Sequence, residues 1–166
     1  MMDCGSPLTD DDMKIVPTDP GHLDILKTWF PDKEKAYDWC GPGLRFPFTD
    51  ETFAEDIHWE RMPTYSLVND KGELIGFGQY YEKAGRCHLA RLVVAPSCRS
   101  MGIGYGFIYR LMRIGMEDLG LGECSLFVIR SNEKALKCYR ALHFEKADYP
   151  PGHPPYNDID FMVYRG

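Results

Sequence analysis

The sequence predicts a mixed α/β fold, in which a central mixed sheet carries helices on both faces. Two patterns support this prediction. A β-hairpin with a polar turn lies near the middle of the chain, and the segments after it alternate between apolar strands and amphipathic helices. Hairpins produce antiparallel pairs and crossover helices produce parallel pairs, so both kinds of pairing are expected in one sheet.

The chain is expected to begin with a strand and a helix. Residues 14–16 are a short run with strand character. Asp19 can then cap a helix and Pro20 can occupy its first turn. Apolar residues recur at helical spacing until Pro31, which is expected to end the helix.

A loop and a second helix are predicted next. Residues 36–48 are aromatic but are interrupted by Gly and Pro, which indicates a loop. Thr49 is a good N-cap for the helix that follows. Phe48 and Phe53 have the spacing of a hydrophobic staple across the start of that helix.

The remaining elements alternate as the fold class requires. The turn sequence Asn69-Asp70-Lys71-Gly72 separates the two strands of the hairpin. The expected strands are 65–68, 74–81, 88–94, 125–129, 144–147 and 159–164, and the expected helices are 102–118 and 132–142.

Length and composition indicate a single globular domain. The chain has 166 residues, of which 44% are hydrophobic and 27% charged. We expect a loosely ordered polar segment at 1–12 and one domain at 13–166. No apolar run approaches the roughly 18 residues of a membrane span, so we expect a soluble protein that does not bind membranes.

Charge and cysteine content exclude further classes. The formal net charge is −6, without the clustered Lys and Arg that nucleic acid binding requires. Six cysteines occur without a Cys-x-x-Cys pair, so we expect no metal site, reduced thiols and a cytoplasmic protein. The acidic residues near the N-terminus are unlike a secretory signal.

A glycine-rich turn after an apolar strand is the most informative motif. The strand end Leu92-Val93-Val94 leads into Gly102, Gly104 and Gly106, with Arg99 between them. Glycines at a helix start let backbone N–H groups approach an anion closely, and arginine adds a forked cationic donor. The motif therefore predicts a site for a phosphorylated cofactor.

The glycines allow two other interpretations. They could merely allow tight helix packing, although each glycine in a helix costs about 1 kcal/mol. They also superficially suggest a dinucleotide fold. A dinucleotide fold turns directly from strand to helix, whereas here Gly102 is well separated from Val94. Its next strand ends at an acidic residue, whereas the next strand of this chain ends at Arg130.

The pattern Arg99-x-x-Gly102-x-Gly104 after Val-Val-x-Pro resembles the pyrophosphate loop of the GNAT family of N-acetyltransferases. A second block, Arg130 to Phe144, is similar to that family's second cofactor motif. Two positions depart from the family pattern. Ser100 stands where many relatives have glycine. His143 replaces a glycine beyond a helix end, where a left-handed residue is often required.

The resemblance implies the acyl-CoA N-acyltransferase fold, with acetyl-CoA as cofactor and direct acetyl transfer to a primary amine of a small molecule, polyamine or peptide. A CoA-binding regulatory domain without turnover and an enzyme for longer acyl groups are the alternatives. The cofactor-binding residues that the resemblance implies are Leu92, Val93, Val94, Arg99, Ser100, Met101, Gly102, Ile103, Gly104, Tyr105, Asn132 and Tyr139.

The resemblance also implies catalytic roles. Tyr139 would protonate the leaving thiolate, because a phenol with a pKa near ~10 is protonated at neutral pH. His88 is the candidate base because imidazole has a suitable pKa. Relatives often carry a carboxylate base in this strand, whereas this strand has none, and Glu82 just upstream is the alternative base. The alternatives are that Tyr139 is a core residue, that His88 is a hydrogen-bonded structural histidine and that Asn132 is a plain N-cap.

Acceptor recognition would fall to the early helices and the late proline-rich loop. Trp39, Arg45 and Tyr156 are the candidate substrate-binding residues there, with simple packing over the sheet as the alternative. The sequence is compatible with a monomer or a homodimer.

Overall fold

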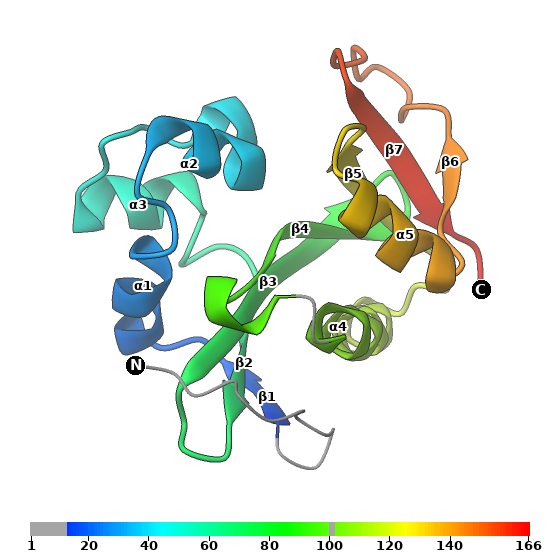
Figure 1. The fold of residues 1–166 in the computed structure, drawn as a ribbon. Helices are drawn as coiled ribbons and strands as arrows, with labels where there is room; N and C mark the ends of the chain where they lie inside the picture. The colour runs from blue at the N-terminus through cyan, green and yellow to red at the C-terminus, as the bar shows by residue number, and fades with distance from the viewer. Residues whose placement is uncertain (1–12, 100–101) are drawn as a thin grey trace. The chain divides into compact units, whose positions relative to one another are not determined.

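The computed structural model describes residues 13–99 and 102–166. Within these ranges the strands form a seven-stranded sheet in the order β1-β2-β3-β4-β5-β7-β6 (Figure 1). β4 and β5 pair in parallel, whereas β1 with β2, β2 with β3, β5 with β7 and β6 with β7 are antiparallel. The predicted mixed α/β class is confirmed.

The elements follow the predicted order with one addition. The strands are β1 (Met13–Pro17), β2 (Thr64–Asn69), β3 (Leu74–Lys83), β4 (Arg86–Val94), β5 (Cys124–Ile129), β6 (Glu145–Ala147) and β7 (Ile159–Tyr164). The helices are α1 (Pro20–Lys27), α2 (Lys33–Cys40), α3 (Asp50–Asp56), α4 (Ile103–Leu119) and α5 (Glu133–Ala141), with 3-10 turns η2 (Gly41–Gly43) and η3 (Pro96–Cys98).

The chain divides into two compact units. The first contains the chain up to Gln79 together with Arg91–Phe107, and the second contains Tyr80–Ala90 and Ile108–Gly166. β3, β4 and α4 each contribute residues to both units. Each unit is described by itself below, and a single domain at 13–166 stays a prediction. The prediction for residues 1–12 lies outside the described residues.

In the first unit, α1 begins where the sequence predicted. The Asp19 carboxylate accepts a hydrogen bond from His22 N–H at 3.0 Å, and His22 Nδ1 accepts one from Asp19 N–H at 3.1 Å. Two backbone donors that the helix cannot satisfy are paired by this capping box. The helix ends at Lys27, four residues before Pro31.

The loop predicted at 36–48 is wrong in its first part, because α2 occupies Lys33–Cys40. Asp32 caps this helix by accepting a hydrogen bond from Lys35 N–H at 2.8 Å. Gly41, with φ of 75°, ends it. The aromatic, Gly- and Pro-rich composition belongs to the residues that follow the helix, and it masked the cap that starts it.

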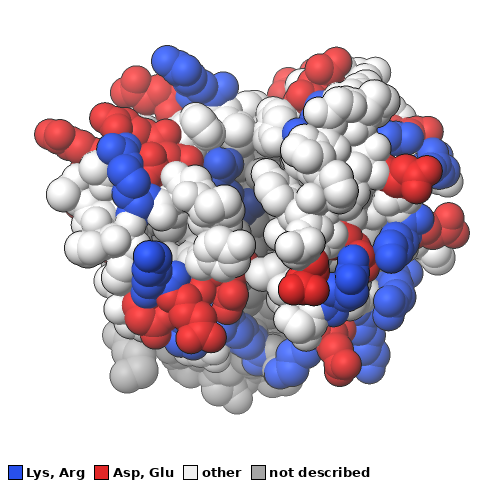
Figure 2. All heavy atoms as spheres, turned by 90° about the horizontal axis from the view of Figure 1, so that it is seen from above, with Lys and Arg blue, Asp and Glu red and all other residues white. Residues whose placement is uncertain are grey.

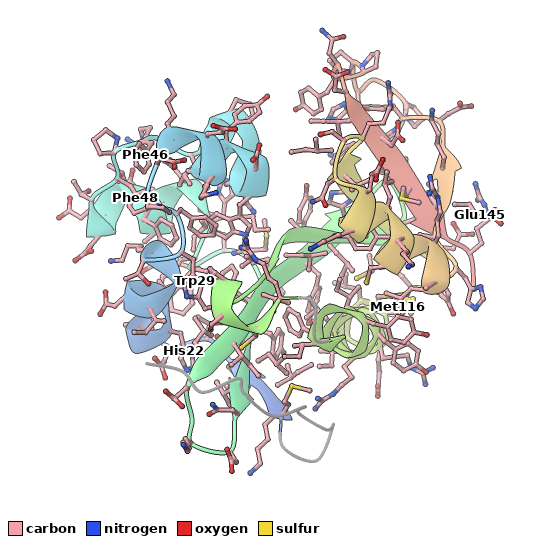
Figure 3. All side chains as sticks on the ribbon, viewed as in Figure 1. His22, Trp29, Phe46, Phe48, Met116 and Glu145 are labelled. Atoms are coloured by element: carbon pink, nitrogen blue, oxygen red, sulfur yellow. The ribbon has the colours of Figure 1, made fainter. Side chains whose placement is uncertain are left out.

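α3 begins as predicted. Thr49 accepts a hydrogen bond from Thr52 N–H at 3.1 Å. The Phe48 and Phe53 rings lie 4.9 Å apart, and Phe46 meets Phe48 edge-on at 5.5 Å (Figure 3). Since Phe53 is 1% exposed, the predicted hydrophobic staple anchors the start of α3 in the core.

In the second unit, a glycine allows α4 to lie close to the strands. A Cβ built at Gly115 would lie 2.6 Å from Cys87 Sγ and 3.0 Å from Tyr80 Cγ. One turn further along, Asp118 accepts a hydrogen bond from the Tyr80 hydroxyl at 2.7 Å. His143 follows α5 with φ of 71°, so the left-handed residue expected beyond this helix is present.

One expectation about the cysteines is wrong. Cys98 is disulfide-bonded, so reduced thiols are not found throughout. Cys40, Cys87, Cys124 and Cys138 are free.

Within residues 13–99 and 102–166 there is no cluster of three or more potential metal ligands. In the same part of the chain, no helix is both long and apolar enough to cross a membrane.

Substitution of Gly115 by Ala should destabilise the second unit. Overpacking costs about 1–3 kcal/mol, and the better helix propensity of Ala offsets only about 1 kcal/mol of that. Urea unfolding should show a net loss for Gly115→Ala and little change for Gly122→Ala, whose added Cβ meets nothing within 4 Å. A Gly115→Ala variant as stable as the wild type would contradict the close packing.

Candidate active site

The turn from β4 into α4 is fixed at its first residue. Ala95 is 1% exposed, and its N–H donates to Ile75 O at 2.9 Å. This hydrogen bond holds the end of β4 beside β3, within the first unit. Pro96–Cys98 then forms η3, and α4 begins at Ile103.

The start of α4 has the properties that a diphosphate group requires. Gly102 has φ of 75°, a conformation that side chains disfavour, and a Cβ there would meet nothing within 4 Å. A Cβ at Gly104 would meet only Val94 Cγ2, at 3.9 Å. The first-turn N–H groups of a helix have no acceptor within the helix, so these groups, uncovered by side chains, fit an anion.

The other predicted cofactor residues surround this turn. Arg99 is exposed, and its Nε donates to Val94 O at 3.3 Å. Tyr105 is 47% exposed, whereas Ile103 is 3% exposed and packs inward. Leu92, Val93 and Val94 are partly exposed at the end of β4. Ser100 and Met101 lie outside the described residues.

Tyr139, the predicted proton donor, lies in α5 of the second unit. It is 8% exposed, and its ring meets Phe144 edge-on at 5.9 Å. Burial raises the pKa of Tyr139, and the neighbouring Cys138 acts in the same direction. The phenol therefore stays protonated throughout the neutral range, as a proton donor must.

His88, the predicted base, is deeply buried in the second unit. It is 2% exposed, and Ser125 Oγ lies 2.8 Å from its Nδ1. Its ring is stacked on Phe161 and contacts Tyr81 and Phe127 edge-on. These contacts are those of a structural histidine, so a proton could reach His88 only through a relay.

Asn132 is the N-cap of α5. Its side-chain oxygen accepts a hydrogen bond from Ala135 N–H at 3.2 Å. This is the local role that the sequence allowed, and the remaining amide N–H₂ group is exposed with the rest of the side chain.

Trp39 and Arg45, predicted to contact the acceptor, both lie in the first unit. Trp39 stacks on Phe30 at 4.2 Å, and its indole Nε1 is buried without a hydrogen-bond partner in the described part of the chain. Arg45 donates to Asp56 at 2.9 Å and to Glu55 at 2.7 Å. Its guanidinium is thus neutralised by two carboxylates.

Tyr156, the third predicted acceptor residue, belongs to an aromatic cluster in the second unit. It is 46% exposed and contacts His153 at 5.2 Å and Phe127 at 6.1 Å, measured between ring centroids. The ammonium group of Lys83 lies 5.7 Å from the centre of the Phe127 ring. The cluster therefore already contains a cation–π contact.

The sequence analysis missed Arg91, which lies directly before the predicted cofactor strand. Its φ of 51° is rare for a residue with a side chain, and its guanidinium contacts Cys40, Asp56, Met62 and Gln79. The only signal in the sequence is a charged residue inside an apolar strand.

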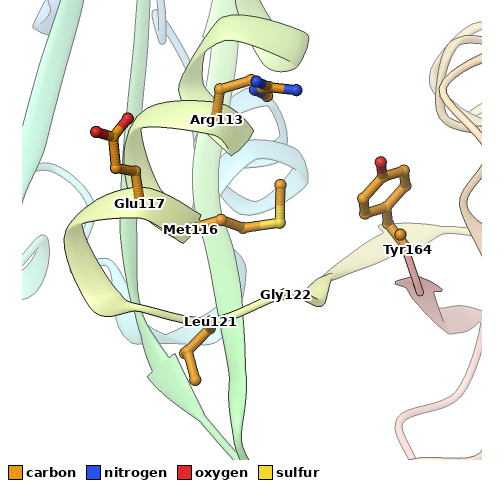
Figure 4. Close-up of a pocket in the computed structure, with 7 residues that line it drawn as sticks. Arg113, Met116, Glu117, Leu121, Gly122 and Tyr164 are labelled. Atoms are coloured by element: carbon orange, nitrogen blue, oxygen red, sulfur yellow. The ribbon is translucent and has the colours of Figure 1, made fainter.

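A separate pocket of about 370 Å³ lies in the second unit, at the C-terminal end of α4 (Figure 4). None of the predicted site residues lines it. Its lining residues are Arg113, Met116, Glu117, Leu121, Gly122, Tyr164 and Gly166.

On the face drawn in Figure 2, acidic and basic side chains of the described residues are interspersed.

Comparisons with known proteins agree with this geometry. Residues 33–144 match the model of the acetyltransferase (GNAT) family. The chain therefore belongs to the GNAT family, which confirms the resemblance, and acetyl-CoA is the cofactor that the family uses.

Two solved structures from Vibrio cholerae illustrate the shared fold. Spermidine N-acetyltransferase in complex with CoA and spermine has a TM-score of 0.71 at 16% identity, covering 93% of this chain and 96% of the other. A dodecameric structure of spermidine N-acetyltransferase has a TM-score of 0.65 at 15% identity, covering 94% and 95%. At these identities the likeness establishes the fold alone.

A curated relative matches a shorter segment. Human alpha/beta-tubulin-N-acetyltransferase 9 is 29% identical over 55 residues, which is 33% of this chain. The matched segment spans only 27% of that relative.

The buried phenol makes stability depend on alkaline pH. Above about pH 10 the unfolded chain ionises Tyr139 while the folded chain, with its raised pKa, retains the proton, so stability falls as pH rises. Tyr139→Phe removes this contribution. Urea unfolding from about pH 8 to about pH 10.5 should therefore show a shallower decline for Tyr139→Phe than for the wild type.

Tyr37, 49% exposed, provides the matched control. Tyr37→Phe should leave the alkaline decline in stability as steep as in the wild type. Equal slopes for the wild type and Tyr139→Phe would show that burial of Tyr139 does not affect its ionisation.

Proposed function

We propose that this chain is an acetyl-CoA-dependent N-acetyltransferase that transfers an acetyl group directly to a primary amine. The observation that supports this most strongly is the open, left-handed Gly102 at the start of α4, immediately after β4. Glycine in this conformation, with space above it, suits close approach of an anion to backbone N–H groups. Family membership supplies the reaction class.

The cofactor supplies an activated acetyl group as a thioester. We assign Arg99, Gly102, Ile103, Gly104 and Tyr105 to its diphosphate, with Ser100 and Met101 in the same loop by resemblance. Leu92, Val93 and Val94 would pair with the pantetheine arm as a sheet edge does. Asn132 would bond the arm through the amide group that capping leaves available.

Tyr139 is proposed to donate a proton to the departing thiolate. Its raised pKa keeps the phenol neutral at working pH. Because an ordinary thiol has a pKa near ~8.5, the thiolate readily accepts a proton from a positioned donor.

His88 is kept as the proposed acceptor of the amine proton. Its burial excludes direct contact with solvent, so the proton would travel through a relay. The Ser125 hydroxyl, 2.8 Å from His88 Nδ1, is the first group available for that relay.

The acceptor is proposed to be a primary amine of a small molecule or peptide. Spermine accompanies CoA in the Vibrio cholerae structure, and the human relative is named for tubulin, so both kinds of amine occur among similar proteins. Trp39, Arg45 and Tyr156 are proposed acceptor contacts. We further propose a cytoplasmic monomer or homodimer without nucleic acid or membrane partners.

Gly104→Ala tests the cofactor site. The added Cβ has space in the folded protein but would project where the diphosphate approaches the backbone. We expect calorimetry with CoA to show affinity reduced about 10-fold or more, equivalent to about 1.4 kcal/mol. Gly122→Ala, also unobstructed, should bind CoA like the wild type. No binding to the wild type at about millimolar CoA would contradict the proposal.

Tyr139→Phe tests turnover. With a panel of amines and detection of free thiol, kcat should fall about 10²-fold or more, the usual contribution of a general acid. CoA affinity is measured beside turnover, because Tyr139 is also among the residues that the resemblance assigns to the cofactor, and loss of the acid should lower kcat by far more than it lowers CoA affinity. Unchanged turnover at every pH would exclude Tyr139 as the acid. CoA binding without thiol release for any amine would favour a binding domain instead.

A further inference from the structure

Arg91 combines backbone strain with an unusual set of contacts, all within the first unit. Its φ of 51° lies in the left-handed region, which non-glycine residues occupy at a cost and mostly at functional positions. The next three residues are the strand end assigned to the cofactor. The strained residue therefore lies directly before the strand end assigned to the cofactor.

The guanidinium of Arg91 is partly buried among neutral groups. Nη1 donates to Gln79 Oε1 at 2.9 Å, and Nε approaches Cys40 Sγ at 3.3 Å. Nη1 also approaches Met62 Sδ at 3.7 Å, and Nη2 contacts the backbone oxygen of Asp56 at 3.4 Å. In residues 13–99 and 102–166, Arg91 forms no ion pair.

Neighbouring groups that could neutralise Arg91 do not do so. Burial raises the pKa of the Cys40 thiol despite the opposing effect of Arg91, so the thiol stays uncharged. The Asp56 carboxylate is paired with Arg45. Burial raises the pKa of Asp56, but the hydrogen bonds from Arg45 outweigh that effect and lower it. Neither group therefore compensates the charge of the partly buried Arg91 side chain.

A buried amide holds this charge in position. Gln79 is 0% exposed, and its Nε2 donates to Ile57 O at 2.7 Å and Thr64 Oγ1 at 3.0 Å. These two bonds fix the amide so that Oε1 faces Arg91. The contacts with the described residues use Nε–H, both N–H groups of Nη1 and one N–H of Nη2, so one N–H of this oriented and unneutralised guanidinium is left to donate to an anion.

We propose that Arg91 binds a carboxylate of the acceptor, so that the preferred substrates are amines that also carry a carboxylate. This inference rests on the proposed acetyltransferase function and narrows its substrate class. Free amino acids and acidic peptides share the required chemistry. A polyamine offers only positive charge and would be repelled by Arg91.

The first test compares acceptors that differ in one carboxylate, with each rate expressed per unprotonated amine because removal of a nearby carboxylate also lowers the pKa of the amine. Each amino acid is paired with its own carboxamide, and tripeptides with Asp at the second position are paired with those carrying Asn. Spermidine is included as a cationic acceptor. A charge-assisted hydrogen bond to Arg91 should make kcat/KM about 10- to 100-fold higher for the acid than for the matching amide. Higher kcat/KM for the carboxamides or for spermidine would overturn the proposal.

The second test changes Arg91. Arg91→Met should abolish the preference for carboxylates, measured as the ratio of the two kcat/KM values within each acceptor pair, and Arg91→Lys should retain part of that preference. Arg61→Met removes the same charge from an exposed position and should keep the full preference. A preference that survives Arg91→Met would overturn the proposal. If Arg91→Met does not fold, the acceptor pairs and Arg91→Lys still decide.

A third measurement separates this inference from the proposed function. The Arg91 side-chain Nε–H signal of the CoA-saturated protein is followed by NMR during titration with glutarate and, separately, with glutaramide. A saturable shift with glutarate alone supports carboxylate binding even if no amine is acetylated. No shift with glutarate would contradict carboxylate binding by Arg91, whether or not acetylation is observed.

Discussion

The buried hydrogen bond from Ala95 N–H to Ile75 O is the constraint on which the candidate site depends. This bond fixes Ala95, which directly follows the end of β4. Residues 91–94 lie before this fixed residue in the chain, and the glycine turn lies after it. Together with the place of β4 beside β3 in the sheet, this attachment positions the strand residues before the turn. Preorganisation of this kind gives a binding site its geometry before a ligand arrives.

The two arginines near Asp56 illustrate how the fold distributes charge. Arg45 lies against two carboxylates at the surface, where an ion pair contributes little to stability. Arg91 is given only neutral acceptors in a chain with a net charge of −6. Among the residues that the structure describes, no acidic side chain forms an ion pair with this guanidinium, as binding of an external carboxylate requires.

Local signals could be read from the sequence, and signals that need tertiary structure could not. Asp19 and Thr49 cap their helices as predicted, because capping depends on residues three positions apart. The glycine turn was found for the same reason. The sequence did not indicate α2, because the Gly- and Pro-rich residues that follow this helix suggested a loop and obscured its N-cap, Asp32. Arg91 was missed because its conformation and contacts arise from residues distant in sequence.

The cross-strand pair of Cys87 and Cys124 has a further consequence. The two residues lie opposite each other in β4 and β5, and both are 0% exposed beneath the close approach of Gly115. A thiol-modifying reagent can reach them only when the second unit opens. When the unit closes faster than the reagent reacts, the rate of alkylation at these two cysteines depends on the free energy of opening. Alkylation of Cys87 and Cys124 therefore measures local unfolding of the second unit.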